Sequence, residues 1–143
     1  MARKYAVQYA ERLLDGTTYH DLVELSSALC SCPQFTVTAP DLGLPQFAFV
    51  FVETLAWFAQ AICSGVWTYY EATPENHQAA MAGALRAFAP GEFAVWYERG
   101  MKDWRDRTRI RAVDDWMKEN DEAANAWLRA FARAHREDIL AMT

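Results

Sequence analysis

The sequence predicts an all-α protein that folds as a single helical domain over residues 1–143. Apolar residues recur at helical spacing in nearly every segment outside residues 31–46. The chain is 52% hydrophobic and 14% aromatic, which supplies a hydrophobic core and argues against disorder. Gly16, Gly65 and the Pro90-Gly91 pair fall between the periodic segments, where they end helices. We therefore expect about seven or eight helices that are joined by short connections.

Two helices are predicted in the first part of the chain. The first ends at Gly16, and its apolar face repeats every fourth residue at Tyr5, Tyr9 and Leu13. Thr18 and Asp21 have the spacing of a capping pair ahead of the second helix, which Pro33 should end. Residues 31–46 contain three prolines and a glycine, so we expect an ordered loop there, with at most a short extended piece.

The segment 46–63 predicts a central helix that is the most buried element of the fold. Its polar residues recur at a seven-residue spacing and form one narrow stripe at Gln46, Glu53 and Gln60. The remaining positions are apolar, so Leu55 and Ile62 are both expected inside. Glu53 and Gln60 interrupt the run, and its length is below a comfortable membrane span. A core helix with no membrane contact is the prediction.

Further helices are predicted after Gly65. A short helical turn covers 66–72, and Thr73 and Pro74 occupy the N-cap and first position of the next helix. The later helices are expected at roughly 92–107, around Val113 and Met117 up to Asn120, and from Asp121 past His135 to Ile139.

Charge and cysteine content restrict the function classes. The net charge of -5 disfavours nucleic acid as a direct ligand, because phosphate binding needs a basic surface. The last third, residues 96–143, carries ten acids and ten bases, which predicts ion pairs there. Cys30, Cys32 and Cys63 are expected to be reduced thiols of a cytoplasmic protein. Because no second ligand pair accompanies Cys30 and Cys32, we expect neither a metal nor another cofactor.

Catalytic residues are not evident from the sequence. Glu53 on the apolar helix is either an acid or base of raised pKa, or a buried carboxylate that neighbouring donors hydrogen-bond. A small enzyme with a cleft around Glu53, His77 and Tyr70 is an alternative function. No nucleophile with a partnered histidine can be assembled, so we expect a protein that is not an enzyme.

Three aromatic residues close together make the segment after Gly65 the best candidate for a recognition surface: Trp67, Tyr69 and Tyr70. Aromatic side chains with polar tips are enriched at interfaces. They are equally able to fill the core beside Gly65. We expect Trp67 to point inward and at least one of the tyrosines to reach solvent.

The run 64–73, the alanine-rich helix after it and the segments 112–116 and 131–138 resemble a bacterial family of helical proteins, a domain of unknown function of which one member acts as a DNA mimic. Family members typically show Asn-Gly-Gly-Phe-x-Gln and then an aromatic residue, a helix, a Leu-Asp-Asp motif and a His-x-Glu-Asp ending. In this chain Ser64, Gly65, Trp67 and Tyr70 stand for the Asn, the first Gly, the Phe and the later aromatic, whereas Val66 and Tyr69 replace the second Gly and the Gln. Residues 113–115 (Val-Asp-Asp) and 135–138 (His-Arg-Glu-Asp) match more closely. The resemblance covers about residues 55–140.

This resemblance implies a non-enzymatic protein that inhibits or regulates a DNA- or RNA-binding protein by placing carboxylates as a nucleic acid places phosphates. The candidate carboxylates are Asp114, Asp115, Glu119, Asp121 and Glu122. Their other interpretation is ordinary solvated helix surface and helix capping. An immunity or anti-defence inhibitor of a nuclease or CRISPR-type complex is a second alternative, and a homodimer is a further possibility.

Overall fold

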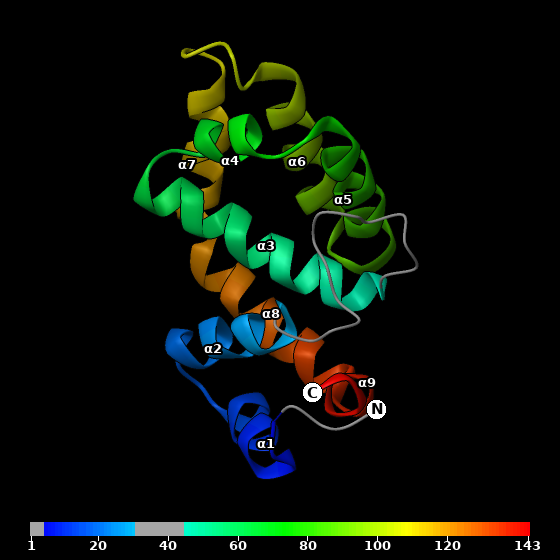
Figure 1. Cartoon of the computed structure of the whole chain (residues 1–143). Coiled ribbons are helices and arrows are strands. Elements are labelled where there is room, and N and C mark those ends of the chain that lie inside the picture. The colour runs from blue at the N-terminus through cyan, green and yellow to red at the C-terminus, as the bar shows by residue number, and fades with distance from the viewer. Residues whose placement is uncertain (1–4, 31–44) are drawn as a thin grey trace. The chain divides into compact units, whose positions relative to one another are not determined.

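The computed structural model describes residues 5–30 and 45–143, and within these ranges all regular structure is helical (Figure 1). The predicted all-α class is confirmed. The described ranges contain nine helices: α1 (Val7–Asp15), α2 (Tyr19–Cys30), α3 (Gln46–Cys63), α4 (Trp67–Ala72), α5 (Glu75–Phe88), α6 (Gly91–Asp103), α7 (Ile110–Glu119), α8 (Asp121–Ala134) and α9 (Arg136–Met142). The short extended piece allowed within 31–46 falls outside the described residues, as does Cys32.

Residue contacts divide the chain into two compact units. The first comprises residues 1–55 and 125–143, and the second comprises residues 56–124. Helices α3 and α8 contribute residues to both units. The single domain expected over residues 1–143 stays a prediction.

In the first unit, α1 packs against α2 and α9. The predicted capping pair forms at the start of α2: the backbone N–H of Asp21 donates to the Thr18 hydroxyl at 3.2 Å, and that of Thr18 donates to the Asp21 carboxylate at 3.2 Å. At the end of α1, the guanidinium of Arg133 donates to the carbonyl oxygens of Leu14 and Gly16, at 2.9 and 3.0 Å. These bonds satisfy carbonyl groups at the end of α1 that lack helical partners.

Helix α3 begins and ends at the predicted residues, and most of its side chains are buried. Leu55 is 6% exposed and Glu53 is 9% exposed. Ile62 is 47% exposed, so the expectation that it lies inside is wrong; it falls in the last turn of α3, beside the exposed Cys63. By length and mean hydropathy (1.4) α3 is able to cross a membrane, and 61% of the helix is buried inside the fold.

An aromatic cluster forms the core of the second unit. Trp57 is fully buried, and its ring meets that of Tyr97 edge-on with centroids 5.1 Å apart. Phe58 and Phe93 pack beside it, with centroids 5.8 Å apart, and both contact Trp116. Such edge-to-face and tilted contacts are favourable beyond the area that they bury.

Three helix boundaries differ from the predictions. Thr73 and Pro74 are expected at the N-cap and the first position of a helix, but α5 begins at Glu75 with Pro74 in the N-cap position. Thr73 instead caps the end of α4, where its hydroxyl donates to the Tyr69 carbonyl at 2.6 Å.

The helix expected to continue to about residue 107 ends at Asp103. The Asp106 carboxylate explains this early end, because it accepts the backbone N–H groups of Thr108 and Arg109, each at 3.0 Å, and so forms a turn. The last predicted helix is divided at His135, where the backbone leaves helical geometry (φ -103°, ψ 24°) between α8 and α9.

Candidate functional site

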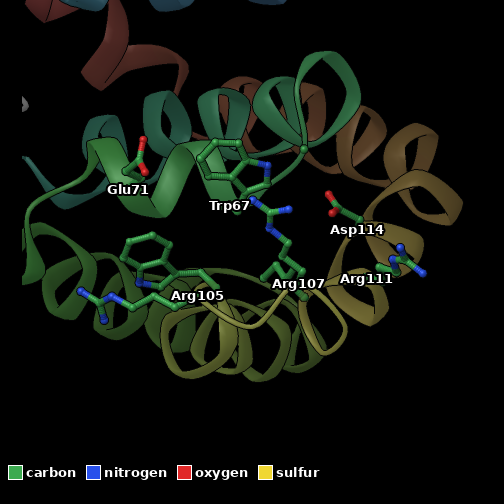
Figure 2. A pocket seen from close by; sticks show the side chains of 9 residues that line it. Trp67, Glu71, Arg105, Arg107, Arg111 and Asp114 are labelled. Atoms are coloured by element: carbon green, nitrogen blue, oxygen red, sulfur yellow. The ribbon is translucent and has the colours of Figure 1, made fainter.

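The second unit contains a cavity of about 560 Å³ beside α4 (Figure 2). Its wall combines residues from α4, from the connection between α6 and α7, and from α7 itself. The lining consists of Gly65, Trp67, Glu71, Trp104, Arg105, Arg107, Ile110, Arg111 and Asp114. Arginine, tryptophan and carboxylate side chains therefore face one another across this cavity.

A hydrogen bond between distant parts of the sequence holds one edge of the cavity. The backbone N–H of Val66 donates to the Asp114 carboxylate at 2.8 Å and ties the start of α4 to α7. Gly65 precedes it with φ +93°, a left-handed conformation that suits glycine and turns the chain out of α3. Trp67 follows as the first residue of α4 and is 41% exposed.

The expected orientation of the three aromatic residues is wrong. Trp67 faces outward, whereas Tyr69 is 4% exposed and Tyr70 is 1% exposed. The reason lies in the hydroxyl groups: that of Tyr70 donates to the Tyr97 carbonyl at 2.9 Å, and that of Tyr69 lies 2.9 Å from the Tyr97 hydroxyl. Both phenols thus find partners inside, which removes the cost of burying them. Burial raises the pKa of Tyr70 well above its usual value, so the phenol remains a neutral donor.

Four arginines alternate along the connection between α6 and α7 and into α7: Arg105, Arg107, Arg109 and Arg111. Arg109 is held by carboxylates, since its guanidinium lies 3.6 Å from Asp106 and 4.0 Å from Asp103. It does not line the cavity. The other three, Arg105, Arg107 and Arg111, do line it. Within residues 5–30 and 45–143, no carboxylate forms an ion pair with any of these three arginines.

The three cavity arginines occupy different positions. Figure 2 shows Arg107 reaching toward Trp67, with Arg105 and Arg111 at opposite ends of the cavity. The guanidinium of Arg105 lies over the ring of Trp104, 4.3 Å from its centroid. This contact orients both side chains. In this view Arg107 therefore lies between the other two arginines.

These arginines are the functional candidates that the sequence analysis missed. A net count over the last third of the chain cancels them against acids elsewhere in the same third. The signal was a local one: an arginine at every second position from 105 to 111, directly after Trp104. A shorter window would have detected a basic, aromatic segment in an acidic protein.

A second cavity, of about 530 Å³, adjoins the first. The two share Glu71, Trp104 and Arg105 as lining residues. Tyr70 and Gln78 also contribute to the second, although both are mostly buried. The shared residues place the two cavities side by side along α4.

The predicted carboxylates lie in two settings. Asp114 is half-buried and engaged by Val66, whereas Asp115, Glu119 and Glu122 are exposed. Asp121 is half-buried; its burial, with a smaller contribution from the neighbouring charge of Glu122, raises the pKa of its carboxyl. Exposed bases also stand on α7, at Arg111 and Lys118. The exposed side of α7 is therefore mixed in charge, with carboxylates and bases interleaved.

The residues of the alternative enzyme site are distributed over both units. Glu53 belongs to the first unit, and His77 and Tyr70 belong to the second, where both are buried. A ring nitrogen of His20 lies 2.8 Å from the Glu24 carboxylate. Among the described residues, no three histidine, cysteine or acidic side chains are grouped as metal ligands.

Comparison with protein-family models, with curated proteins and with solved structures gave no significant match for this chain. The resemblance to the DNA-mimic family therefore stays a prediction.

Proposed function

We propose that this chain is a non-enzymatic, cytoplasmic protein-binding module that regulates a DNA- or RNA-binding protein. The proposed contact surface consists of Trp67 together with the exposed carboxylates Asp115, Glu119 and Glu122. Tyr69 and Tyr70 are no longer part of it, because a partner cannot reach side chains that are buried in the core.

The observation that carries the proposal is the link between the aromatic and the acidic parts of this surface. The hydrogen bond from Val66 to Asp114 fixes the start of α4 against α7, so exposed Trp67 stands beside the helix that bears Asp115 and Glu119. A large exposed aromatic side chain next to charged groups is typical of an interface anchor and its rim. Acidic side chains at the rim favour a basic partner and accelerate its association.

The test compares two variants that change the net charge equally. Asp115→Lys/Glu119→Lys reverses charges on the proposed surface, and Glu75→Lys/Glu92→Lys reverses two exposed carboxylates on α5 and α6. Asp114 is left intact because its carboxylate holds Val66. Tagged protein is used to capture partners from the host, and binding to the recovered partner is then measured at about 50 mM and 500 mM salt.

We expect Asp115→Lys/Glu119→Lys, the α7 reversal, to weaken binding at low salt by roughly tenfold or more. The effect should be smaller at high salt, because salt screens exposed charges. The control reversal should change binding little. Equal losses in the two variants would show that only net charge matters and would contradict a defined surface. If Trp67→Ala abolishes binding while the α7 reversal leaves it intact, the acidic part of the proposal is wrong.

A further inference from the structure

We infer that the arginine–tryptophan cavity of the second unit binds a nucleotide-class ligand, one that joins phosphate groups to a planar ring. This inference goes beyond the proposed protein contact and concerns a small molecule. It rests on the side chains that line the cavity, on the absence of any described carboxylate paired with its arginines and on the size of the space.

The cavity is locally basic in an acidic protein. It is lined by three arginines and two carboxylates, while the whole chain carries a net charge of -5. One of those carboxylates, Asp114, is already engaged by the N–H of Val66. The excess of positive over negative charge among the lining side chains therefore favours an anionic ligand.

A site for an anion needs arginines whose charge is not already paired with a carboxylate, and the arginines from 105 to 111 differ in this respect. Arg109 is paired with Asp103 and Asp106, and it is not among the residues that line the cavity. Arg107 and Arg111 line the cavity, and no described carboxylate pairs with either. A guanidinium presents a planar set of donors that matches phosphate oxygens bidentately, and it is more weakly hydrated than an ammonium group. Phosphate is thus the anion that these side chains fit.

The indole rings supply the second half of the recognition. Trp67 is 41% exposed and lines the same cavity toward which Arg107 reaches (Figure 2). Aromatic faces stack on nucleobases, and this contact is tolerant of base identity. Glu71, one turn after Trp67 on α4, is an acceptor for the hydroxyl or amino groups of such a ligand.

The size of the space favours a mononucleotide over a polymer. About 560 Å³ lies within the range of roughly 300–1,000 Å³ that is typical of small-molecule sites. A single strand would need a longer basic path, whereas the adjoining cavity adds no new arginine to the shared Arg105. We therefore commit to a nucleoside diphosphate or triphosphate as the occupant.

The experiment uses the purified full chain without any partner, so that its failure leaves the proposed protein contact untouched. Calorimetry measures binding of ADP, GDP and UDP, with adenosine and inorganic pyrophosphate as the two halves of the ligand. We expect at least one nucleotide to bind more than tenfold more tightly than either adenosine or pyrophosphate. No nucleotide binding up to millimolar concentration would overturn the inference.

Matched variants locate the site. Arg107→Gln should weaken nucleotide binding by roughly tenfold or more, the scale of a lost charge-assisted hydrogen bond. Arg109→Gln removes a charge from the same connection but not from the cavity, and it should leave binding within twofold. Trp67→Ala should weaken the binding of the nucleotide but not the binding of pyrophosphate. All variants are compared by circular dichroism to confirm that they remain folded.

Three outcomes would contradict the inference. Equal weakening by Arg107→Gln and Arg109→Gln would indicate diffuse charge attraction and no defined site. Pyrophosphate binding as strong as that of every nucleotide, unaffected by Trp67→Ala, would leave an anion site without base recognition. A single-stranded oligonucleotide that binds more than tenfold tighter than the mononucleotides would replace the small molecule by a polymer.

Discussion

Gly100 on α6 lies where a side chain would overlap the ring and hydroxyl of Tyr70. In an ordinary helix, Gly→Ala stabilises, by about 0.5–1 kcal/mol. The expectation here is the opposite, because Tyr70 is 1% exposed and cannot move aside into solvent. Its hydroxyl is also fixed, since it donates to the Tyr97 carbonyl at 2.9 Å one turn before Gly100.

The magnitude follows from the two contacts that an added methyl group disturbs. Overpacking a close-packed core costs about 1–3 kcal/mol. Displacing the phenol of Tyr70 from its acceptor costs about 0.5–1.5 kcal/mol more. After the gain in helix propensity is subtracted, Gly100→Ala should destabilise the protein by about 1–3.5 kcal/mol.

Gly83 provides a matched control within the same unit. It lies in the middle of α5, and a Cβ atom added there would meet no other atom within 4 Å. Gly83→Ala should therefore stabilise, by about 0.5–1 kcal/mol. Urea unfolding followed by circular dichroism measures both free energies of unfolding. If Gly100→Ala is as stable as wild type or more so, Tyr70 does not pack against α6 as described, whatever the result for Gly83.

Two further predictions concern α3 and the turn before α7. Leu55→Asp should lower the free energy of unfolding by at least about 2 kcal/mol, because the buried leucine is lost and a carboxylate is desolvated, whereas Ile62→Asp should be tolerated; equal melting temperatures for the two variants would contradict this. Backbone hydrogen bonds from Arg109 and Thr108 hold the pKa of the Asp106 carboxyl below its usual value, so its stabilisation is present above about pH 4 and is lost as pH falls. The difference in melting temperature between wild type and Asp106→Asn should therefore shrink from pH 6 to pH 3, and a constant difference would refute the assignment.

The fold class and most helix boundaries could be predicted because they depend on local signals. The capping pair of Thr18 and Asp21, the stop at Gly65 and the apolar run of α3 each act within a few residues. The early end of α6 also has a local cause, but the short side chain of Asp106 is hard to distinguish from ordinary helix surface until its hydrogen bonds to the backbone are seen.

The candidate site was harder to predict because it depends on contacts between distant residues. The hydrogen bond from Val66 to Asp114 joins residues that are 48 positions apart, and no local pattern in either segment predicts it. Periodicity could not decide which of Trp67, Tyr69 and Tyr70 is buried, since the partner of both tyrosines is Tyr97 on another helix. The cavity arginines were visible in the sequence, but only as a local alternation that a longer charge count conceals.

The burial of the two tyrosines changes how mutations near the site have to be interpreted. Helix α4 has only 6 residues, too few to be stable on its own, so its position depends on Tyr69 and Tyr70 inside and on Asp114 at its start. Tyr70→Ala would therefore release α4 and displace Trp67 even if no ligand touches the tyrosine. A loss of binding in that variant reports a lost support, whereas Trp67→Ala removes a side chain that faces solvent. Only the tryptophan variant can separate contact with a ligand or partner from collapse of the surface that presents it.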